Sequence, residues 1–278
     1  MTVRFWGVRG SIPSPGPTTM RYGGNTSCVS VELGDNTVLV FDAGTGIRAL
    51  GKALEASTAA IFVLLTHPHW DHIQGFPFFC PIYQPERPVY VFPPPLGQTR
   101  WCSALEQMDK AHFPVTPDAL PSRTQYITDN VQAFLRRHGF CLTPIAINHP
   151  GGGAGYRLEH AGRSVVFLTD NELDPPYEKA TPFEAFVAFC QGTDVLIHDA
   201  QYLAGDMPRK HGWGHSLVPQ ACALAAAAEV KQLILYHHDP DRTDAELDTI
   251  QATARTWLHA SSPHLQCSAA YEGLVIDI

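Results

Sequence analysis

The chain has 278 residues, of which 45% are hydrophobic and 17% charged, so it is long enough to bury a sizeable core and too apolar to be disordered. Its formal net charge of -8 argues against a protein that mainly grips long nucleic acid, because phosphate contacts need a basic face. The N-terminus lacks the apolar core of a signal peptide, and no apolar run reaches membrane-spanning length. We therefore expect one domain over residues 1–278, in a cytoplasmic protein without membrane contacts.

The seven cysteines are scattered along the chain, odd in number and never spaced C-x-x-C. This pattern is typical of reduced, mostly buried thiols, and it predicts neither a disulfide framework nor a thiolate metal site.

The first 42 residues predict strands. Residues 3–5 open the chain, apolar residues alternate with polar ones over 29–33, and a buried strand follows over 38–41. Asp42, Ala43 and Gly44 end that strand, and a short helix is expected over 47–55. Two glycine-bearing loops, residues 7–11 and 23–27, precede these strands.

An unbroken apolar run over residues 61–65 predicts a strand buried on both faces. It leads directly into Thr66-His67-Pro68-His69-Trp70-Asp71-His72, which places three imidazoles and a carboxylate within six residues. Imidazole nitrogen and carboxylate oxygen are the ligand atoms that zinc and similar divalent ions take. The alternative is a solvated, histidine-rich turn, since loops do concentrate polar residues.

Residues 76–125 are rich in proline and predict an irregular segment that covers one side of a site, with a short helix over 104–110. A weaker helix is expected over 130–137. Further helices are expected over 183–190, 217–229 and 244–259, with Ser216 as the N-cap of the second.

Six predicted strands end in a polar residue that could bind a ligand. These residues are Asp42, His67, His149, Asp170, His198 together with Asp199, and His237. In α/β sheets, ligands bind beyond the carboxyl ends of the strands, so the ends of strands that share a sheet system share one rim. The sequence therefore predicts a site at that rim.

The motif His67-x-His69-x-Asp71-His72, followed by His149, Asp170 and His237, resembles the metallo-β-lactamase superfamily over nearly the whole chain. The resemblance implies an α/β fold, a four-layer αβ/βα sandwich with the metal site on one rim. It assigns His67, His69 and His149 to one metal, Asp71, His72 and His237 to the other, and Asp170 to both. Seven ligands exceed the four of one tetrahedral zinc.

Two Zn²⁺ ions are the first choice for such imidazole-rich ligation, and Mn²⁺ or iron is the alternative. His238 competes with His237 for one ligand position, because the two are adjacent at the end of a strand.

The segment Gly214-His215-Ser216 resembles the phosphodiesterase branch of the superfamily, which includes ribonuclease Z, PhnP-type enzymes and cyclic-nucleotide phosphodiesterases. The resemblance implies that His215 protonates the leaving oxygen. It also implies that Asp199, in His198-Asp199-Ala200, orients that histidine. A surface histidine and an ordinary strand-end turn are the alternatives at these two positions. Asp71 would orient the attacking hydroxide as well as bind metal.

Three further residues lie in segments that resemble loops near the site. Asp42 is interpreted as structural, bracing a ligand histidine. Arg9 and Asn25, on the two glycine-bearing loops, are candidate substrate contacts, although glycine turns are more often only turns.

These observations predict a dinuclear metal-dependent hydrolase, favoured as a phosphodiesterase for a small-molecule phosphodiester such as a cyclic nucleotide. No long basic arm of the kind that grips transfer RNA is found. A thioester or lactone hydrolase of the same fold is the rival enzyme, and a non-catalytic metal-binding assembly or regulatory protein is the rival from another class. The sequence allows a homodimer but does not predict one.

Overall fold

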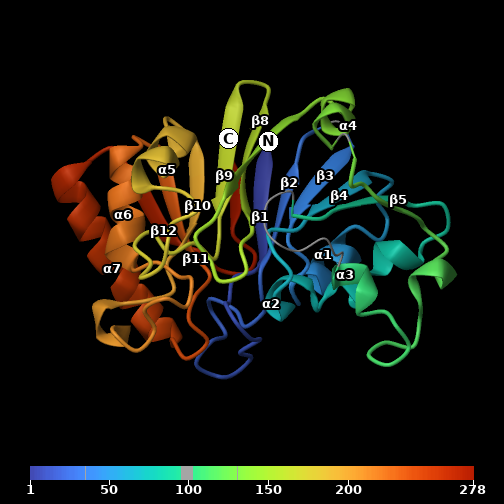
Figure 1. Cartoon of the computed structure of the whole chain (residues 1–278), viewed down its shortest axis with the longest axis horizontal. Coiled ribbons are helices and arrows are strands. Elements are labelled where there is room, and N and C mark those ends of the chain that lie inside the picture. The colour runs from blue at the N-terminus through green and yellow to red at the C-terminus, as the bar shows by residue number, and fades with distance from the viewer. Residues whose placement is uncertain (35, 95–102, 130) are drawn as a thin grey trace.

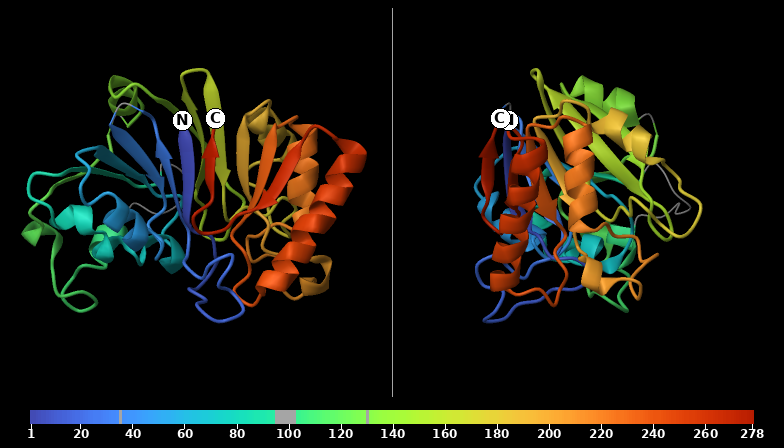
Figure 2. Two further views of the ribbon diagram at one scale, coloured as in Figure 1. Left: turned by 180° about the vertical axis from the view of Figure 1, so that it is seen from behind. Right: turned by 90° about the vertical axis from the view of Figure 1, so that its left-hand side faces the viewer.

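The computed structural model describes residues 1–278 apart from 35, 95–102 and 130. Two β-sheets face each other at the centre, and helices cover the outer side of each, which gives four layers (Figure 1). This is the predicted αβ/βα sandwich, so the expected fold class is confirmed. The two ends of the chain lie side by side, because β1 pairs antiparallel with β13 (Figure 2).

The first sheet has seven strands in the order β13-β1-β2-β3-β4-β5-β6. Their bounds are β1 Thr2–Gly7, β2 Cys28–Glu32, β3 Thr37–Phe41, β4 Ala60–Leu64, β5 Pro88–Phe92, β6 Arg123–Tyr126 and β13 Val275–Asp277. The second sheet has six strands in the order β12-β11-β10-β9-β8-β7. Their bounds are β7 Cys141–Ala146, β8 Ala154–His160, β9 Arg163–Leu168, β10 Val195–Asp199, β11 Gln232–Tyr236 and β12 Gln266–Ala269.

Helices α1 and α3 lie outside the first sheet, α5, α6 and α7 lie outside the second, and α4 packs against β7 (Figure 1). Their bounds, with the short α2, are α1 Ile47–Ala53, α2 Trp70–Ile73, α3 Ser103–Glu106, α4 Val131–Arg137, α5 Phe183–Cys190, α6 Val218–Ala227 and α7 Asp244–Ser261. In the described part of the chain, no helix combines the length and the apolar character needed to cross a lipid bilayer.

Buried aromatic residues join the two sheets beneath the rim that carries the site. Phe41 of β3 stacks on Phe167 of β9 with ring centroids 5.0 Å apart. The buried hydroxyl of Tyr156 donates to the carbonyl of Leu65 (2.6 Å), and that of Tyr236 donates to the carbonyl of Gly7 (2.7 Å). Because buried hydroxyls need partners, these two bonds fix the position of one sheet relative to the other.

Helix α7 shows how local sequence sets an element boundary. The Thr243 side chain accepts from the amide of Glu246, and the Glu246 side chain accepts from the amide of Thr243, which satisfies two free donors at the helix start. Helix α6 differs from expectation, because Leu217 rather than Ser216 is its N-cap. The Ser216 hydroxyl instead donates to the carbonyl of Asn171 (2.6 Å), so the predicted cap is wrong.

The proline-rich segment is more regular than predicted. It contributes two strands, β5 and β6, which extend the first sheet by parallel pairing. The flanking prolines concealed these strands in the sequence, although the apolar run of β5 is itself strand-like. The helix expected over 104–110 is a single turn, α3, and residue 130 of the next expected helix lies outside the described residues, as does Cys102. The six described cysteines are all free thiols.

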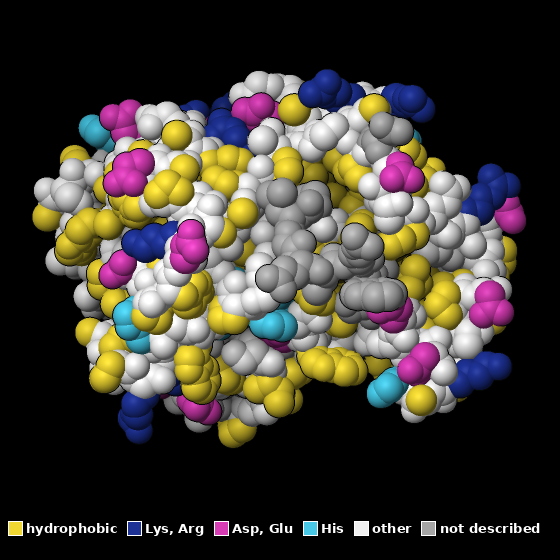
Figure 3. All heavy atoms as spheres, in the orientation of Figure 1, with side chains coloured by type: hydrophobic (Ala, Val, Ile, Leu, Met, Phe, Trp, Pro, Cys, Tyr) yellow, Lys and Arg dark blue, Asp and Glu magenta, His cyan; other side chains and the backbone are white. Residues whose placement is uncertain are grey.

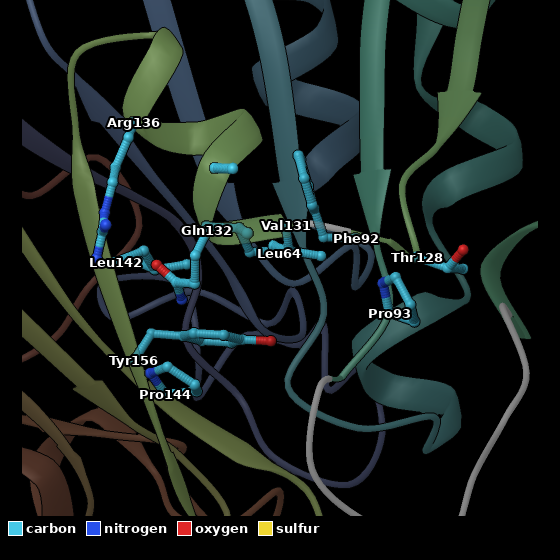
Figure 4. Close-up of a pocket in the computed structure, with 11 residues that line it drawn as sticks. Leu64, Phe92, Pro93, Thr128, Val131, Gln132, Arg136, Leu142, Pro144 and Tyr156 are labelled. Carbon is cyan, nitrogen blue, oxygen red and sulfur yellow. The ribbon is translucent and has the colours of Figure 1, made fainter.

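A largely apolar pocket of about 510 Å³ opens beside α4 (Figure 4). Leu64, Phe92, Val131, Leu142 and Tyr156 are among the residues that line it. None of the predicted metal ligands lines it, so this pocket is separate from the site described next.

Candidate metal centre

The turn after β4 presents four polar side chains in one place. His69 is the N-cap of α2, in an extended conformation, and Asp71 and His72 lie in the first turn of that helix. His67 and His72 are buried, whereas His69 is exposed. The turn therefore directs both buried and accessible ligand atoms at the carboxyl end of β4.

The first candidate ligand group comprises His67, His69, His149 and Asp170. Nδ1 of His69 lies 3.0 Å from Nε2 of His67 and 3.0 Å from Nε2 of His149. Oδ1 of Asp170 lies 3.6 Å from Nε2 of His67. Segments more than 80 residues apart in sequence thus bring their ligand atoms to one point.

The second candidate ligand group comprises Asp71, His72, Asp170 and His237. Oδ2 of Asp170 lies 3.1 Å from Nε2 of His72 and 3.2 Å from Nε2 of His237. Oδ2 of Asp71 lies 3.2 Å from each of the same two nitrogens. Asp170 belongs to both groups and directs one oxygen to each.

Three residues at strand ends have left-handed backbone conformations, with φ of 61° at Asp42, 51° at Asp170 and 60° at His237. Such angles are uncommon for residues other than glycine and cost free energy, and they cluster at functional sites where the surroundings enforce them. The rim of this sandwich therefore carries strained backbone at the residues that aim into the site.

The donor set fits a pair of divalent cations. His67 donates through Nδ1 to Thr66 (3.1 Å) and His149 through Nδ1 to the carbonyl of Gly214 (3.0 Å), so both Nε2 lone pairs converge on Nδ1 of His69, which can carry at most one proton. Nε2 of His72 is buried and, despite two carboxylate oxygens within 3.2 Å, makes no hydrogen bond of acceptable geometry. Converging lone pairs and an unpartnered buried nitrogen are unfavourable unless a cation balances them.

The electrostatics of the two groups differ. Burial lowers the pKa of His67 well below its usual value and that of His149 to about 4, so both rings are neutral, as metal ligands must be. Burial also opposes protonation of His72, but Asp170, Asp71 and Asp42 outweigh it and raise its pKa well above the usual value. The three carboxylates therefore create a negative field that attracts positive charge to the second group.

Residues outside the two groups orient the ligand side chains. His72 donates through Nδ1 to Asp42 (2.7 Å), so Asp42 orients a histidine of the second group. His237 donates through Nδ1 to the side-chain oxygen of Gln201 (2.8 Å). The amide of Ser11, in the first glycine-bearing loop, donates to Oδ2 of Asp71 (2.7 Å). Neither the contact of Gln201, which follows Asp199 by two residues, nor that of Ser11 was predicted from the sequence.

His215 lies beside both groups, and its Nδ1 donates to Oδ2 of Asp199 (2.7 Å). The other oxygen of Asp199 accepts from the amide of Ser216 (3.0 Å), which fixes the carboxylate. Burial opposes protonation of His215, but Asp199 outweighs it and raises the pKa of the imidazole. The structure thus brings His215 and Asp199 together as a hydrogen-bonded pair. Nδ1 of His215 lies 4.0 Å from Oδ1 of Asp170.

The structure brings His237 rather than His238 to the cluster, because Nε2 of His238 donates to the carbonyl of Ala270 (2.8 Å). It does not bring Arg9 there: the guanidinium is fully buried and donates to the carbonyls of Gly23, Asp239 and Arg242. The side chain of Asn25 donates to Glu272 (2.9 Å). Both side chains are thus held by protein groups, although Nη2 of Arg9 is buried without a hydrogen-bond partner.

Residues 37–238 match the beta-lactamase superfamily domain. The chain belongs to this family. The ribonuclease Z of Shouchella clausii (strain KSM-K16) is 25% identical over 85% of this chain and 86% of that protein. The resemblance drawn from the sequence is confirmed, and with it the class of enzyme, a metal-dependent hydrolase.

Solved structures of this superfamily share the fold. The metallo-beta-lactamase fold protein YhfI from Bacillus subtilis superimposes with a TM-score of 0.69, at 19% identity, over 99% of each chain. A diphosphatase from the PhnP family superimposes with a TM-score of 0.66, at 19% identity, over 100% of this chain and 97% of that one.

Proposed function

We propose that this hydrolase is a dinuclear phosphodiesterase that acts on a small phosphodiester such as a cyclic nucleotide. The observation that carries the proposal is the His215–Asp199 pair, because it sets a proton donor beside two metal-ligand groups. Similarity to a protein named ribonuclease Z supports phosphodiester chemistry.

Two Zn²⁺ ions fit the imidazole-rich donor set best, with Mn²⁺ or iron as substitutes. His67, His69 and His149 would hold one ion and Asp71, His72 and His237 the other, with Asp170 bound to both. When bound, such a pair lowers the pKa of a water molecule and stabilises negative charge on phosphoryl oxygens. Asp71, held by the amide of Ser11, would also orient the attacking water through its carboxylate.

His215 would protonate the leaving oxygen. Its Nδ1 proton is engaged by Asp199, so in the protonated imidazole Nε2 carries the proton available for transfer. Because Asp199 raises the pKa of His215, the protonated ring persists to higher pH than a free histidine would allow. Asp199 therefore contributes both orientation and proton affinity.

The distribution of charge favours a small substrate over transfer RNA. The chain carries 19 Lys and Arg against 27 Asp and Glu. On the face seen in Figure 3, most of the Lys and Arg side chains that are visible lie toward the margins. A polynucleotide needs basic groups along its path, whereas one phosphodiester needs only the cations of the site.

A substrate panel tests the proposal. Protein loaded with Zn²⁺ is assayed with bis-p-nitrophenyl phosphate, 2′,3′- and 3′,5′-cyclic nucleotides, precursor transfer RNA, a thioester and a lactone. We expect turnover of phosphodiesters with a small diester preferred. Faster turnover of the thioester or lactone would replace the proposal with that rival activity, and preference for precursor transfer RNA would overturn the choice of substrate.

A further inference from the structure

The segment just before His215 has little to hold it by packing, because residues 208–213 are exposed or half-buried although His215 itself is buried. Gly212 and Gly214 have φ of 89° and 92°, in the left-handed region that favours glycine, and Trp213 between them is 60% exposed. Yet a proton donor must be held close to its working geometry to be effective. Something other than apolar contact must therefore fix this loop.

The side chain of Glu172 provides that restraint. It is 2% exposed, and its two carboxylate oxygens accept separately from the amides of Gly212 (2.8 Å) and Gly214 (2.9 Å). A buried carboxylate is costly unless it is hydrogen-bonded, and bonds from amides to a charged acceptor are stronger than neutral ones. Two such bonds to alternate amides hold the loop at both of its glycines.

The restraint reaches the metal centre through Gly214. The carbonyl of Gly214 accepts from Nδ1 of His149 (3.0 Å), and a Cβ at this position would lie 2.0 Å from that nitrogen. The amide of Glu172 donates to the carbonyl of Asn148, the residue before His149 (2.9 Å). Glu172 is therefore connected to His149 from two directions and to His215 through the adjacent peptide.

We infer that Glu172 is a positioning residue, which holds residues 212–215 so that His149 faces its metal and His215 faces the leaving group. The part concerning His215 rests on the phosphodiesterase function proposed above; the part concerning His149 does not. Glu172 touches neither substrate nor metal in this account, and it acts only through the peptide that it binds.

The test compares Glu172→Gln with wild type. The variant keeps the shape of the side chain but replaces one acceptor oxygen with an NH₂ group that opposes an amide donor, so one of the two bonds is lost. Glu184→Gln is the matched control, since Glu184 is exposed and lies in α5, 12 residues further along the chain. Both variants are first checked for folding by circular dichroism.

Three readouts follow. Zn²⁺ affinity, measured by competition with a chromophoric chelator, should weaken about 10–100-fold in Glu172→Gln, as when a group that orients a ligand histidine is lost. Hydrogen exchange of a peptide covering residues 208–217 should become faster. At saturating Zn²⁺, hydrolysis of a 3′,5′-cyclic nucleotide should fall about 10-fold or more, whereas bis-p-nitrophenyl phosphate, whose leaving group needs no proton, should change much less. Glu184→Gln should match wild type in all three.

Equal metal affinity and an equal ratio of the two substrates in Glu172→Gln and wild type would overturn the inference. If the variant does not fold, hydrogen exchange of the wild-type protein decides: protected amides at Gly212 and Gly214 support the restraint, and exchange at the unprotected rate contradicts it. If wild type cleaves no phosphodiester, the proposed function fails, and the inference for His149 is then decided by metal affinity and hydrogen exchange.

Discussion

The two sheets contribute to the metal centre in different ways. The first sheet supplies His67, His69, Asp71 and His72 from one seven-residue turn after β4, so their proximity is local. The second sheet supplies its ligands singly, from the ends of different strands and from loops, so their proximity depends on the whole topology. A compact turn can present metal ligands by itself, whereas ligands from separate strands need other groups to orient each of them.

The largest effect is expected from a change in the turn after β4, which supplies its ligands from one short segment. His67→Ala removes a buried ligand from the first group, so we expect loss of bound metal and a fall in kcat/KM of about 10³-fold or more, since the metals contribute several kcal/mol. Metal content by mass spectrometry and kcat/KM are the measurements. Retention of two metals per chain in this variant would contradict the ligand assignment.

His215→Ala tests the part of the site that the second sheet supplies, without removing a proposed metal ligand. We expect kcat for a cyclic nucleotide to fall about 10²–10⁴-fold with metal content unchanged, because a proton donor is lost. Unchanged turnover would remove His215 from the mechanism. Comparison with His67→Ala separates loss of the metals from loss of the acid.

Asp42→Asn tests how the turn after β4 and its histidines are oriented. The carboxylate of Asp42 accepts from His72 and from the amide of Thr66 (2.9 Å), so it fixes both the ring and the start of the turn. We expect metal affinity to weaken about 10–100-fold with the fold retained. Competition with a chelator measures it, and an affinity equal to wild type would mean that the turn holds its shape without Asp42.

Asp199→Asn tests how His215, on the side of the second sheet, is oriented and charged, through the pH dependence of kcat. Asp199 raises the pKa of His215, so the protonated ring is present at low pH and is lost as pH rises through that raised value. Removing the charge should therefore move the basic limb of the kcat–pH profile to lower pH. A basic limb that stays in place would show that another group sets it.

The smallest effect is expected at the other end of β10, away from the rim. Burial would raise the pKa of Asp194, but hydrogen bonds from Lys231 and from the amide of Ser164 outweigh it and lower the pKa. The lowered pKa means that Asp194 stabilises the fold above about pH 4 and less so as pH falls further. Asp194→Asn should cost about 1 kcal/mol of unfolding free energy at pH 7, less at pH 3, and leave kcat unchanged. Denaturant unfolding at the two pH values measures this, and an equal cost at both would contradict it.

The same contrast explains what the sequence could predict. The turn from His67 to His72 can be recognised from its composition, because three imidazoles and a carboxylate lie within six residues. The polar residues at strand ends predict a shared rim, because the apolar pattern shows where each strand ends. Glu172 and Gln201 gave no such signal, because their partners, two loop amides and one imidazole, become neighbours only after the chain has folded. Arg9 likewise looked available in the sequence and is buried among carbonyl groups.

A calorimetric titration of metal-free protein with Zn²⁺ tests the central claim most directly. We expect two equivalents per chain in wild type and one tight equivalent in His237→Ala, because the first ligand group does not include His237. A single equivalent in wild type, or none, would contradict a centre built from two ligand groups that share Asp170.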